Sequence, residues 1–196
     1  MTNALWLAIL QSLITIGAVV LLWSLHLRLV DRPVFKWWAW AWTSFALYLG
    51  VGSLAVPLSL EWTLPKVTVV VLGAVFGFLP PPLLVFGARS MLSPDLPTRR
   101  EQRIGLGLVM ALGVATILLS VWWRDPIESF YVRIVPRTLL LAAALLYCAS
   151  VFLSLWRLNG SRASLITGGV CAVYGVTQTI YGAALLSRLM GAGDLK

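Results

Sequence analysis

The chain has 196 residues, of which 60% are hydrophobic and only 11% are charged. Soluble domains carry about 25% charged residues, so this chain has too few charges to cover a water-facing surface. Its net charge of +8 would suggest nucleic acid as the partner of a soluble protein. Here the basic residues lie in short linkers between apolar runs, which is typical of a membrane protein. Composition therefore indicates the lipid bilayer as the surroundings and no nucleic-acid partner.

Six apolar segments are each long enough to cross a hydrocarbon core of roughly 30 Å. In chain order they run over residues 4–27, 37–57, 67–87, 104–123, 132–156 and 163–186. We therefore predict an all-α, polytopic transmembrane helical bundle that forms one domain over residues 1–188, followed by a short tail, 189–196. Pro80, Pro81 and Pro82 fall inside the third segment. Because proline lacks a backbone N–H and clashes with preceding carbonyls, we expect that helix to kink or break there.

The charges of the linkers predict the orientation of the segments. The linkers after the first, third and fifth segments hold nine basic residues, namely Arg28, Arg32, Lys36, Arg89, Arg99, Arg100, Arg103, Arg157 and Arg162. The other side holds six, namely Lys66, Arg124, Arg133, Arg137, Arg188 and Lys196. Lys and Arg favour the cytoplasmic side, so we expect the N-terminus outside. Six spans that begin outside also end outside, so either the protein has six spans or a seventh follows Lys196.

Four tryptophans occur within the six residues Trp37-Trp-Ala-Trp-Ala-Trp42, directly after the basic linker that ends at Lys36. Tryptophan is enriched where hydrocarbon meets the lipid headgroups. This stretch therefore predicts a membrane surface on the cytoplasmic side.

The predicted segments are poor in catalytic chemistry. No Asp, Glu or Lys lies near the middle of any of them, which leaves no Schiff-base lysine and no carboxylate proton relay. His26 is the only histidine. Cys148 and Cys171 are expected at similar depth on neighbouring antiparallel helices, but two thiols without histidine or carboxylate make a poor metal site. We expect no catalytic residue, metal or cofactor in this chain.

Two arginines at the outer end of the fifth segment are candidates for a binding site. Arg133 and Arg137 are four residues apart, with Pro136 between them, so they share one helix face. Charges within a membrane are usually functional, which suggests an extracytoplasmic anion site or an ion pair with Glu128 or Asp125. The alternative is that both arginines extend their side chains to the outer headgroups.

Uncharged polar side chains provide further candidates. Tyr174, Gln178 and Tyr181 share one face of the sixth segment at helical spacing, and Tyr48 lies on the second segment. Such residues either hold helices together or line a polar pocket that opens outward. The predicted ligand-binding residues, given both possibilities, are Arg133, Arg137, Tyr174, Gln178, Tyr181 and Tyr48.

Three stretches carry a family resemblance: the tryptophan run, the following Phe45-Ala-Leu-Tyr48, and Phe78-Leu-Pro-Pro-Pro-Leu-Leu-Val-Phe-Gly-Ala-Arg89. They resemble the N-terminal membrane modules of bacterial sensor histidine kinases and diguanylate cyclases. The resemblance implies a sensory module of the bacterial inner membrane, commonly with seven spans and dimeric, that passes a signal to a cytoplasmic catalytic domain. The chain has no kinase, cyclase or PAS-like region, so by itself it is not expected to be an enzyme.

In this interpretation a small molecule or a membrane property is the stimulus, and Pro80–Pro82 form the switch, since switching needs two packings of similar energy. A second hypothesis is a small-solute carrier or channel. It is supported by the similarity of Gly73-Ala-Val-Phe-Gly77 to Cys171-Ala-Val-Tyr-Gly175, as in inverted-repeat transporters. A third is an accessory subunit that packs against a larger complex through glycine seams, which we expect at Gly50 with Gly52 and at Gly73 with Gly77.

Overall fold

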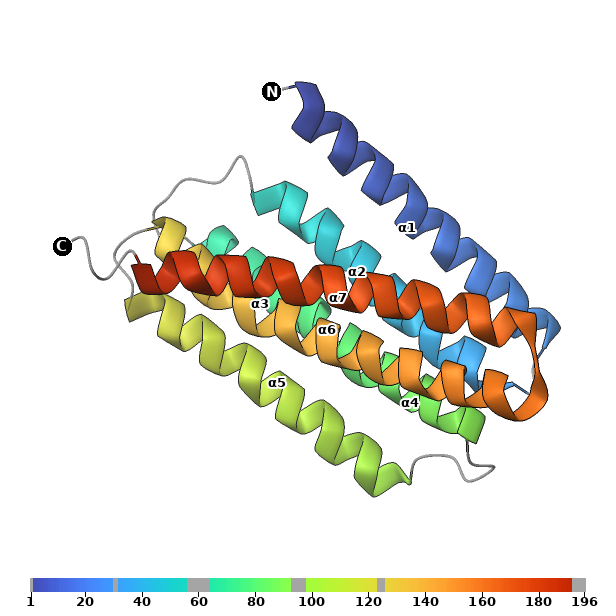
Figure 1. The fold of residues 1–196 in the computed structure, drawn as a ribbon. Helices are drawn as coiled ribbons and strands as arrows, with labels where there is room; N and C mark the ends of the chain where they lie inside the picture. Colours follow the sequence, from blue (N-terminus) through green and yellow to red (C-terminus); the bar gives the residue numbers. More distant parts are fainter. Residues whose placement is uncertain (1, 30–31, 56–63, 93–97, 123–125, 192–196) are drawn as a thin grey trace.

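The computed structural model describes residues 2–29, 32–55, 64–92, 98–122 and 126–191. Nearly all of these residues are helical, and none of them is in a strand. The described helices are α1 (Thr2–Arg28), α2 (Pro33–Ala55), α3 (Leu64–Phe78), α4 (Pro80–Leu92), α5 (Arg99–Trp122), α6 (Pro126–Asn159) and α7 (Arg162–Gly191). The predicted all-α fold is therefore confirmed (Figure 1).

Several of these helices are suited to a membrane. Helices satisfy their backbone hydrogen bonds internally, which hydrocarbon requires. Among the described residues, five helical segments are long and apolar enough to cross a bilayer: Gln11–Arg28, Leu64–Leu92, Arg99–Trp122, Glu128–Asn159 and Arg162–Gly191. Helix α2 is not among these segments. The membrane character of the chain is thus supported, whereas six spans and an outer N-terminus remain predictions.

The helices run back and forth between two ends of the bundle (Figure 1). At one end lie the α1–α2 connection, the end of α4, the start of α5 and the turn between α6 and α7. We call this the basic end, because it gathers the nine linker cations that were predicted to lie on one side. At the far end α1 begins and α7 ends, the latter at Gly191, beyond the predicted domain boundary at residue 188. Residues 192–196 lie outside the described part of the chain.

The third predicted segment is broken at its prolines, as expected. Helix α3 ends at Phe78 and α4 begins at Pro80. The chain path still resembles one helix, because the Leu79 amide donates to the Val75 carbonyl at 3.3 Å and the Leu83 amide donates to the Leu79 carbonyl at 3.4 Å. Proline has no amide hydrogen, so the three carbonyls at residues 76–78 lack the donors that a continuous helix would supply. All three prolines are buried.

Helices α6 and α7 form a hairpin that packs along its whole length (Figure 1). Gly160, with φ of +67°, makes the turn in a conformation that favours glycine. Glycines of α7 then face leucines of α6 every seven residues, so that an added Cβ would lie within 3.0 Å of a leucine side chain in each of three pairs: Gly168 with Leu153, Gly175 with Leu146 and Gly182 with Leu139. We call these pairs the glycine seam. Small residues allow close backbone approach, which is how membrane helices associate.

The glycine seams expected from the sequence differ from this. Among the described residues, an added Cβ at Gly50 or Gly52 would meet no atom within 4 Å, and one at Gly73 would meet only Val51, at 3.8 Å. Gly50 and Gly52 therefore form no seam with another described helix of this chain, and their packing against a larger complex stays a prediction. Gly77 alone among the four is in tight contact, with Arg137 and Tyr48. Spacing of small residues shows where helices could approach, but not whether a neighbour is present.

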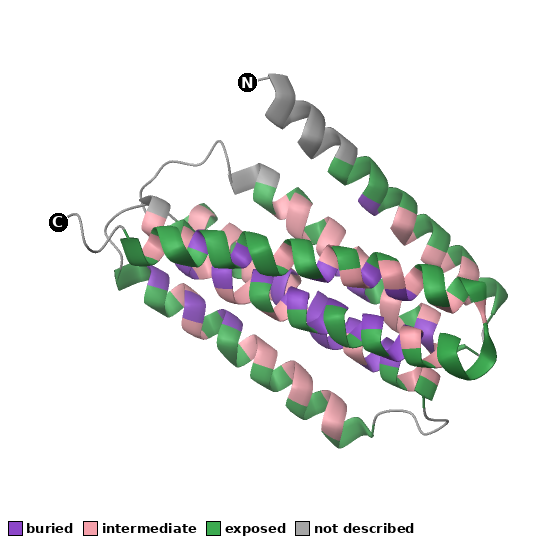
Figure 2. Ribbon diagram, in the orientation of Figure 1, coloured by how far each residue is buried: buried purple, intermediate pink, exposed green. Residues whose placement is uncertain are grey.

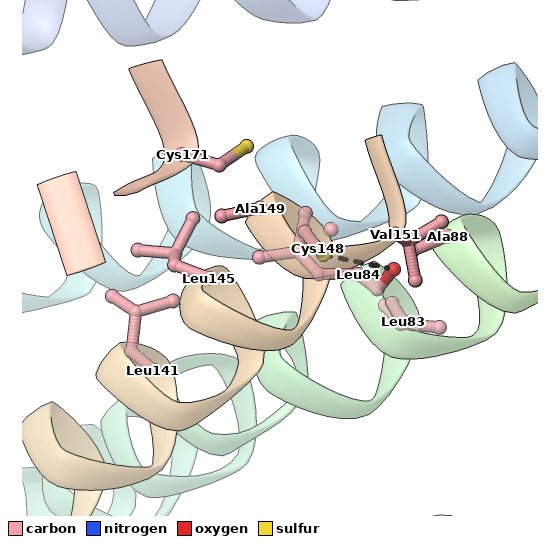
Figure 3. Close-up of a cluster of buried hydrophobic side chains, with 10 residues drawn as sticks. Leu83, Leu84, Ala88, Leu141, Leu145, Cys148, Ala149, Val151 and Cys171 are labelled. Carbon is pink, nitrogen blue, oxygen red and sulfur yellow. Dashed lines mark hydrogen bonds between the residues drawn. The ribbon is translucent and has the colours of Figure 1, made fainter. Parts of the chain in front are cut away.

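The main core lies toward the basic end, where α2, α4, α6 and α7 meet (Figures 2 and 3). Its centre is the Leu84 carbonyl, which accepts hydrogen bonds from Trp38 Nε1 at 3.3 Å and from Cys148 Sγ at 3.5 Å. Gly87 makes room for the Trp38 ring, since an added Cβ would lie 2.3 Å from Trp38 Cδ1. Trp38 also packs edge-on against Phe152. Part of the tryptophan run thus packs inside the bundle and does more than mark a membrane surface.

Helix α1 is peripheral. Its contacts with the described bundle are to α2, and in Figure 1 its first half diverges from the other helices. Trp23 anchors it by donating from Nε1 to Thr43 Oγ1 at 3.0 Å. Most described residues of α1 are exposed (Figure 2), which suits a helix whose outer faces contact lipid.

Candidate functional site

A cavity of about 180 Å³ lies between α2, α3, α5 and α6, toward the far end of the bundle. Most of its lining is apolar and comes from Val51, Gly52, Val69, Val70, Gly73, Ala74, Phe78, Phe130 and Ile134. Its polar lining consists of Tyr48, Thr116, Arg133 and Arg137. The structure therefore brings three of the six predicted ligand-binding residues, Tyr48, Arg133 and Arg137, to one wall of a cavity.

The small residues of α2 and α3 account for this empty space. Gly52 lines the cavity, and an added Cβ there would meet no atom within 4 Å. Gly73 lines it from α3 with similar freedom. Gly52 is exposed, so the cavity opens at the surface of the bundle beside α2. Its volume leaves room for a small ligand.

Arg137 is the central side chain of the site. Its Cζ atom lies 3.9 Å from the centroid of the Tyr48 ring, a cation–π contact. Its Nε and Nη1 atoms are buried and have no hydrogen-bond partner among the described residues. Leaving buried charged donors without an acceptor costs about 1–3 kcal/mol or more. An acceptor that reached these two atoms would therefore be bound favourably.

Arg133 lies one turn before Arg137 on the same face of α6. Its Nε atom donates to the Ser129 carbonyl at 3.2 Å, which ties the side chain to its own helix. Both arginines line the cavity, and no carboxylate does so among the described residues. The cavity wall on α6 is therefore positively charged. Asp125, one of the two predicted ion-pair partners, lies outside the described residues.

The broken end of α3 adjoins Arg137. An added Cβ at Gly77 would lie 2.9 Å from Arg137 Cδ and 3.0 Å from the Tyr48 ring, so glycine is needed for Arg137 to lie against α3. Gly77 belongs to the last turn of α3, where the carbonyls at residues 76–78 lack amide donors. The C-terminal end of a helix carries partial negative charge and attracts cations. The side chain of Arg137 therefore passes beside a helix end that favours a cation.

The three predicted residues of α7 lie on the other side of Arg137. Tyr174 and Tyr181 are close enough to interact with it electrostatically, and Tyr174 also interacts with Gln178. Tyr174 lines a separate, small cavity of about 20 Å³ beside Pro80 and not the larger one. Tyr181 is 48% exposed. The structure thus groups Tyr174 with Arg137 but does not bring Gln178 or Tyr181 to the larger cavity.

Sequence reasoning missed the contribution of α5. Thr116 lines the cavity, and its hydroxyl donates to the Gly113 carbonyl at 2.8 Å. Its position as a buried polar residue within an apolar run was a usable signal. Phe130 also lines the cavity, but no sequence pattern distinguishes it from the other aromatic residues of the chain.

An ion pair connects the broken span to α5 at the basic end. Arg89 of α4 and Glu101 of α5 approach to 2.9 Å between Nη1 and Oε1. Glu101 also begins α5 in a reciprocal cap, because its Oε2 accepts from the Thr98 amide at 2.8 Å while the Thr98 hydroxyl accepts from the Glu101 amide at 3.2 Å. A movement of α4 therefore acts directly on the start of α5.

Other chemistry finds little support in the described part of the chain. No group of three or more His, Cys, Asp or Glu residues that could hold a metal ion occurs there. Cys148 and Cys171 are both buried in the main core. Comparisons with protein-family models, curated proteins and solved structures find no match to this chain.

Proposed function

We propose that this chain is a membrane-embedded sensory module in which a ligand in the cavity changes the arrangement of the broken span α3–α4. The observation that carries this proposal is the position of Arg137. It lines the cavity, has buried donors without a partner, and lies against the last turn of α3. A single side chain thus connects the space for a ligand with the break at Pro80–Pro82.

The mechanism follows from competition for the guanidinium group. Without a ligand, the Arg137 guanidinium lies over the Tyr48 ring, and its side chain passes beside the last turn of α3, whose partial negative charge attracts it. An acceptor in the cavity withdraws part of this interaction from α3. A ligand shifts a conformational equilibrium only by its differential affinity for the two states. Here the two states differ in whether Arg137 interacts with α3 or with the ligand.

The break gives the span freedom to respond. A helix interrupted at Pro80–Pro82 lacks three consecutive backbone hydrogen bonds, so a change of angle there breaks few contacts. The other half, α4, runs from the break to the basic end and contacts α5 there through the exposed pair of Arg89 and Glu101. Motion at the break is therefore expected to move α4 at the basic end.

The location and partners belong to the same proposal. The gathering of linker cations at one end favours a cytoplasmic basic end and an N-terminus outside, in the bacterial inner membrane. A kinase or cyclase domain in a longer, dimeric protein is the expected recipient of the signal. A reporter fused after Lys196 that is active on only one side of the membrane tests the orientation, and a cytoplasmic C-terminus would contradict it.

The proposal is tested by filling the cavity with a side chain. Leu92 of α4 and Leu158 of α6 are 50% and 81% exposed at the basic end and accept spin labels through cysteine substitution. We expect Gly52→Leu, which places a leucine into the cavity, to change the distance distribution between these labels in bilayers. Gly50→Leu is the matched control on the same helix, since Gly50 does not line the cavity.

The two variants decide the matter together. A change with Gly52→Leu but not with Gly50→Leu supports transmission from the cavity to α4. Equal distributions in the parent chain and in Gly52→Leu contradict it. The native thiols Cys148 and Cys171 are buried, and the unsubstituted chain serves to show that they remain unlabelled.

A small-solute carrier remains the second candidate because the same cavity could hold a transported solute. The packing of Leu84, Cys148 and Trp38 toward the basic end gives no support for a continuous path. Solute flux into sealed vesicles that Gly52→Leu abolishes would favour the carrier.

A further inference from the structure

We infer that the cavity accepts a small organic carboxylate with an apolar body. This inference rests on the proposed function and gives the chemical class of its ligand. The two main walls of the cavity differ in charge and polarity. The α6 wall carries Arg133 and Arg137, while the α3 wall presents Val69, Val70 and Ala74.

Charge selects an anion. Arginines are present on the wall, and no carboxylate lines the cavity among the described residues. A cationic ammonium offers no acceptor to Arg137, and a neutral hydroxyl or carbonyl oxygen accepts a weaker hydrogen bond than a carboxylate does. Hydrogen bonds to ionised groups are shorter and stronger than neutral ones, and guanidinium is well matched to carboxylate. The ligand therefore carries its negative charge toward α6.

One charge is sufficient. The Nε atom of Arg133 is already used by the Ser129 carbonyl. Arg137 lacks an acceptor for two of its donors, and Tyr48 contributes a ring face and not a second charge. A dianion such as inorganic phosphate would require further donors at a wall that is mostly apolar. The balance of the lining favours a monoanion.

Volume and polarity require an apolar body. A cavity of about 150 Å³ lined by aliphatic and aromatic side chains holds benzene, and this one has about 180 Å³. A bare ion would leave the valines of α3 facing empty space. A benzoate-sized molecule fills both parts, with its carboxylate toward Arg137 and its ring toward Val70. Such a ligand lies across the bundle, from α6 to α3, and so contacts the half of the broken span that precedes the prolines.

The test is a binding series on the purified chain in lipid nanodiscs, measured by calorimetry. The probes are benzoate, benzyl alcohol, benzylamine and inorganic phosphate. The first three are similar in size and differ in charge, whereas phosphate is an anion without an apolar body. We expect benzoate to bind at least about tenfold more tightly than benzyl alcohol, as a charged hydrogen bond implies. Benzylamine and phosphate are expected to bind more weakly still. Equal binding of benzoate and benzyl alcohol, or tighter binding of phosphate, overturns the inference.

Variants assign the binding to this cavity. Arg137→Gln is expected to weaken benzoate about tenfold or more while leaving benzyl alcohol unchanged. Arg188→Gln, at an exposed arginine near the end of α7, is the matched control for loss of one positive charge. Val70→Phe fills the apolar side and is expected to weaken benzoate with Arg137 intact, which covers the case in which Arg137→Gln does not fold. Unchanged benzoate affinity in Val70→Phe contradicts binding in the cavity.

The outcomes also separate this inference from the proposed function. If benzoate binds as expected but leaves the distance between labels at Leu92 and Leu158 unchanged, the signalling proposal fails and the ligand class stands. If Gly52→Leu changes that distance while benzoate does not bind, the signalling proposal stands and the ligand class is wrong.

Discussion

The two ends of α6 meet their neighbours in opposite ways. Toward the basic end, Cys148 and Phe152 pack into a core around the Leu84 carbonyl and the Trp38 ring. Toward the far end, Arg133 and Arg137 face a cavity. From Leu139 to Leu153 the opposite face of the same helix keeps the regular glycine seam with α7. One helix thus combines a fixed attachment, a dense core and an open site.

This difference indicates a division of labour along the bundle. Close packing leaves an element few alternative positions, because filled interiors resist small displacements. An unfilled region with a broken helix beside it can adopt a second arrangement with little loss of contact. We therefore expect substitutions at the basic end to change stability, and substitutions at the far end to change binding and conformation.

The largest effect is expected for Gly87→Ala. Its added Cβ would lie 2.3 Å from Trp38 Cδ1 and 2.6 Å from Trp38 Nε1, so the ring must leave its place and the hydrogen bond to Leu84 is lost. Overpacking of a filled core costs about 1–3 kcal/mol, and we expect the upper part of that range. Thermal unfolding in detergent measures it. The counterpart at the far end is Gly52→Ala, which meets no atom and should lose no stability. Similar losses of stability in both variants would contradict the proposed difference between the two ends of the bundle.

The glycine seam should show a graded effect. Added Cβ atoms at Gly168 and Gly175 would lie 3.2 Å from the backbone nitrogens of Leu153 and Leu146, which cannot move separately from α6. At Gly182 the near atoms belong to the flexible side chains of Leu139 and Thr138.

We therefore expect alanine at Gly168 or Gly175 to cost about 1–2 kcal/mol and alanine at Gly182 to cost less. Thermal unfolding again measures the difference. Gly169→Ala is the control, because its added Cβ meets nothing within 4 Å. The reverse order, with Gly182→Ala the most damaging, would show that the side chains and not the backbone limit the approach.

A smaller loss of stability is expected for Gly77→Ala, together with a change of function. The added Cβ would contact Arg137 Cδ at 2.9 Å and the Tyr48 ring at 3.0 Å. Both are side chains beside an open cavity and can shift, so we expect a loss of about 1 kcal/mol or less. The displaced guanidinium should alter benzoate affinity in calorimetry and the label distance at the basic end. A variant that loses as much stability as Gly87→Ala would mean that the site is rigid.

The smallest effect is expected for Glu101→Gln. The amide keeps the reciprocal cap with Thr98 but removes the charge that pairs with Arg89. Both side chains are more than 40% exposed, and exposed ion pairs contribute about 0–1 kcal/mol. Thermal unfolding measures the difference in stability between the parent chain and the variant, and this difference should shrink from low to high salt. A larger loss would show that this pair holds α4 to α5 more firmly than its exposure implies.

Much of the architecture was accessible from the sequence because it follows from local chemistry. Apolar runs predicted the helices, and the triple proline predicted the break at residue 79. Linker cations predicted which connections lie at the same end. The site was accessible in part: helical spacing placed Arg133 with Arg137, and charge within an apolar segment marked them as unusual.

The remaining features depend on which surfaces meet. Gly52 and Gly87 are both glycines of apolar helices, yet one faces a cavity and the other faces Trp38. The seven-residue spacing of Gly168, Gly175 and Gly182 was present in the sequence, but its leucine partners became evident only with the register of α6 against α7. For the same reason Tyr174, Gln178 and Tyr181, although they share one face of α7, do not line the larger cavity.

The composition of the core has a consequence for the synthesis of the protein. Chains are made from the N-terminus, and early segments can begin to fold before later ones exist. Here α2 and α4 are made first, but the centre of their common core is supplied by Leu145, Cys148 and neighbouring residues of α6. Until α6 enters the membrane, the buried face of α4 and the Leu84 carbonyl have only part of their partners. The α6–α7 hairpin thus completes the assembly, and a ribosome stalled before α6 would hold an unfinished bundle that quality-control proteases can recognise.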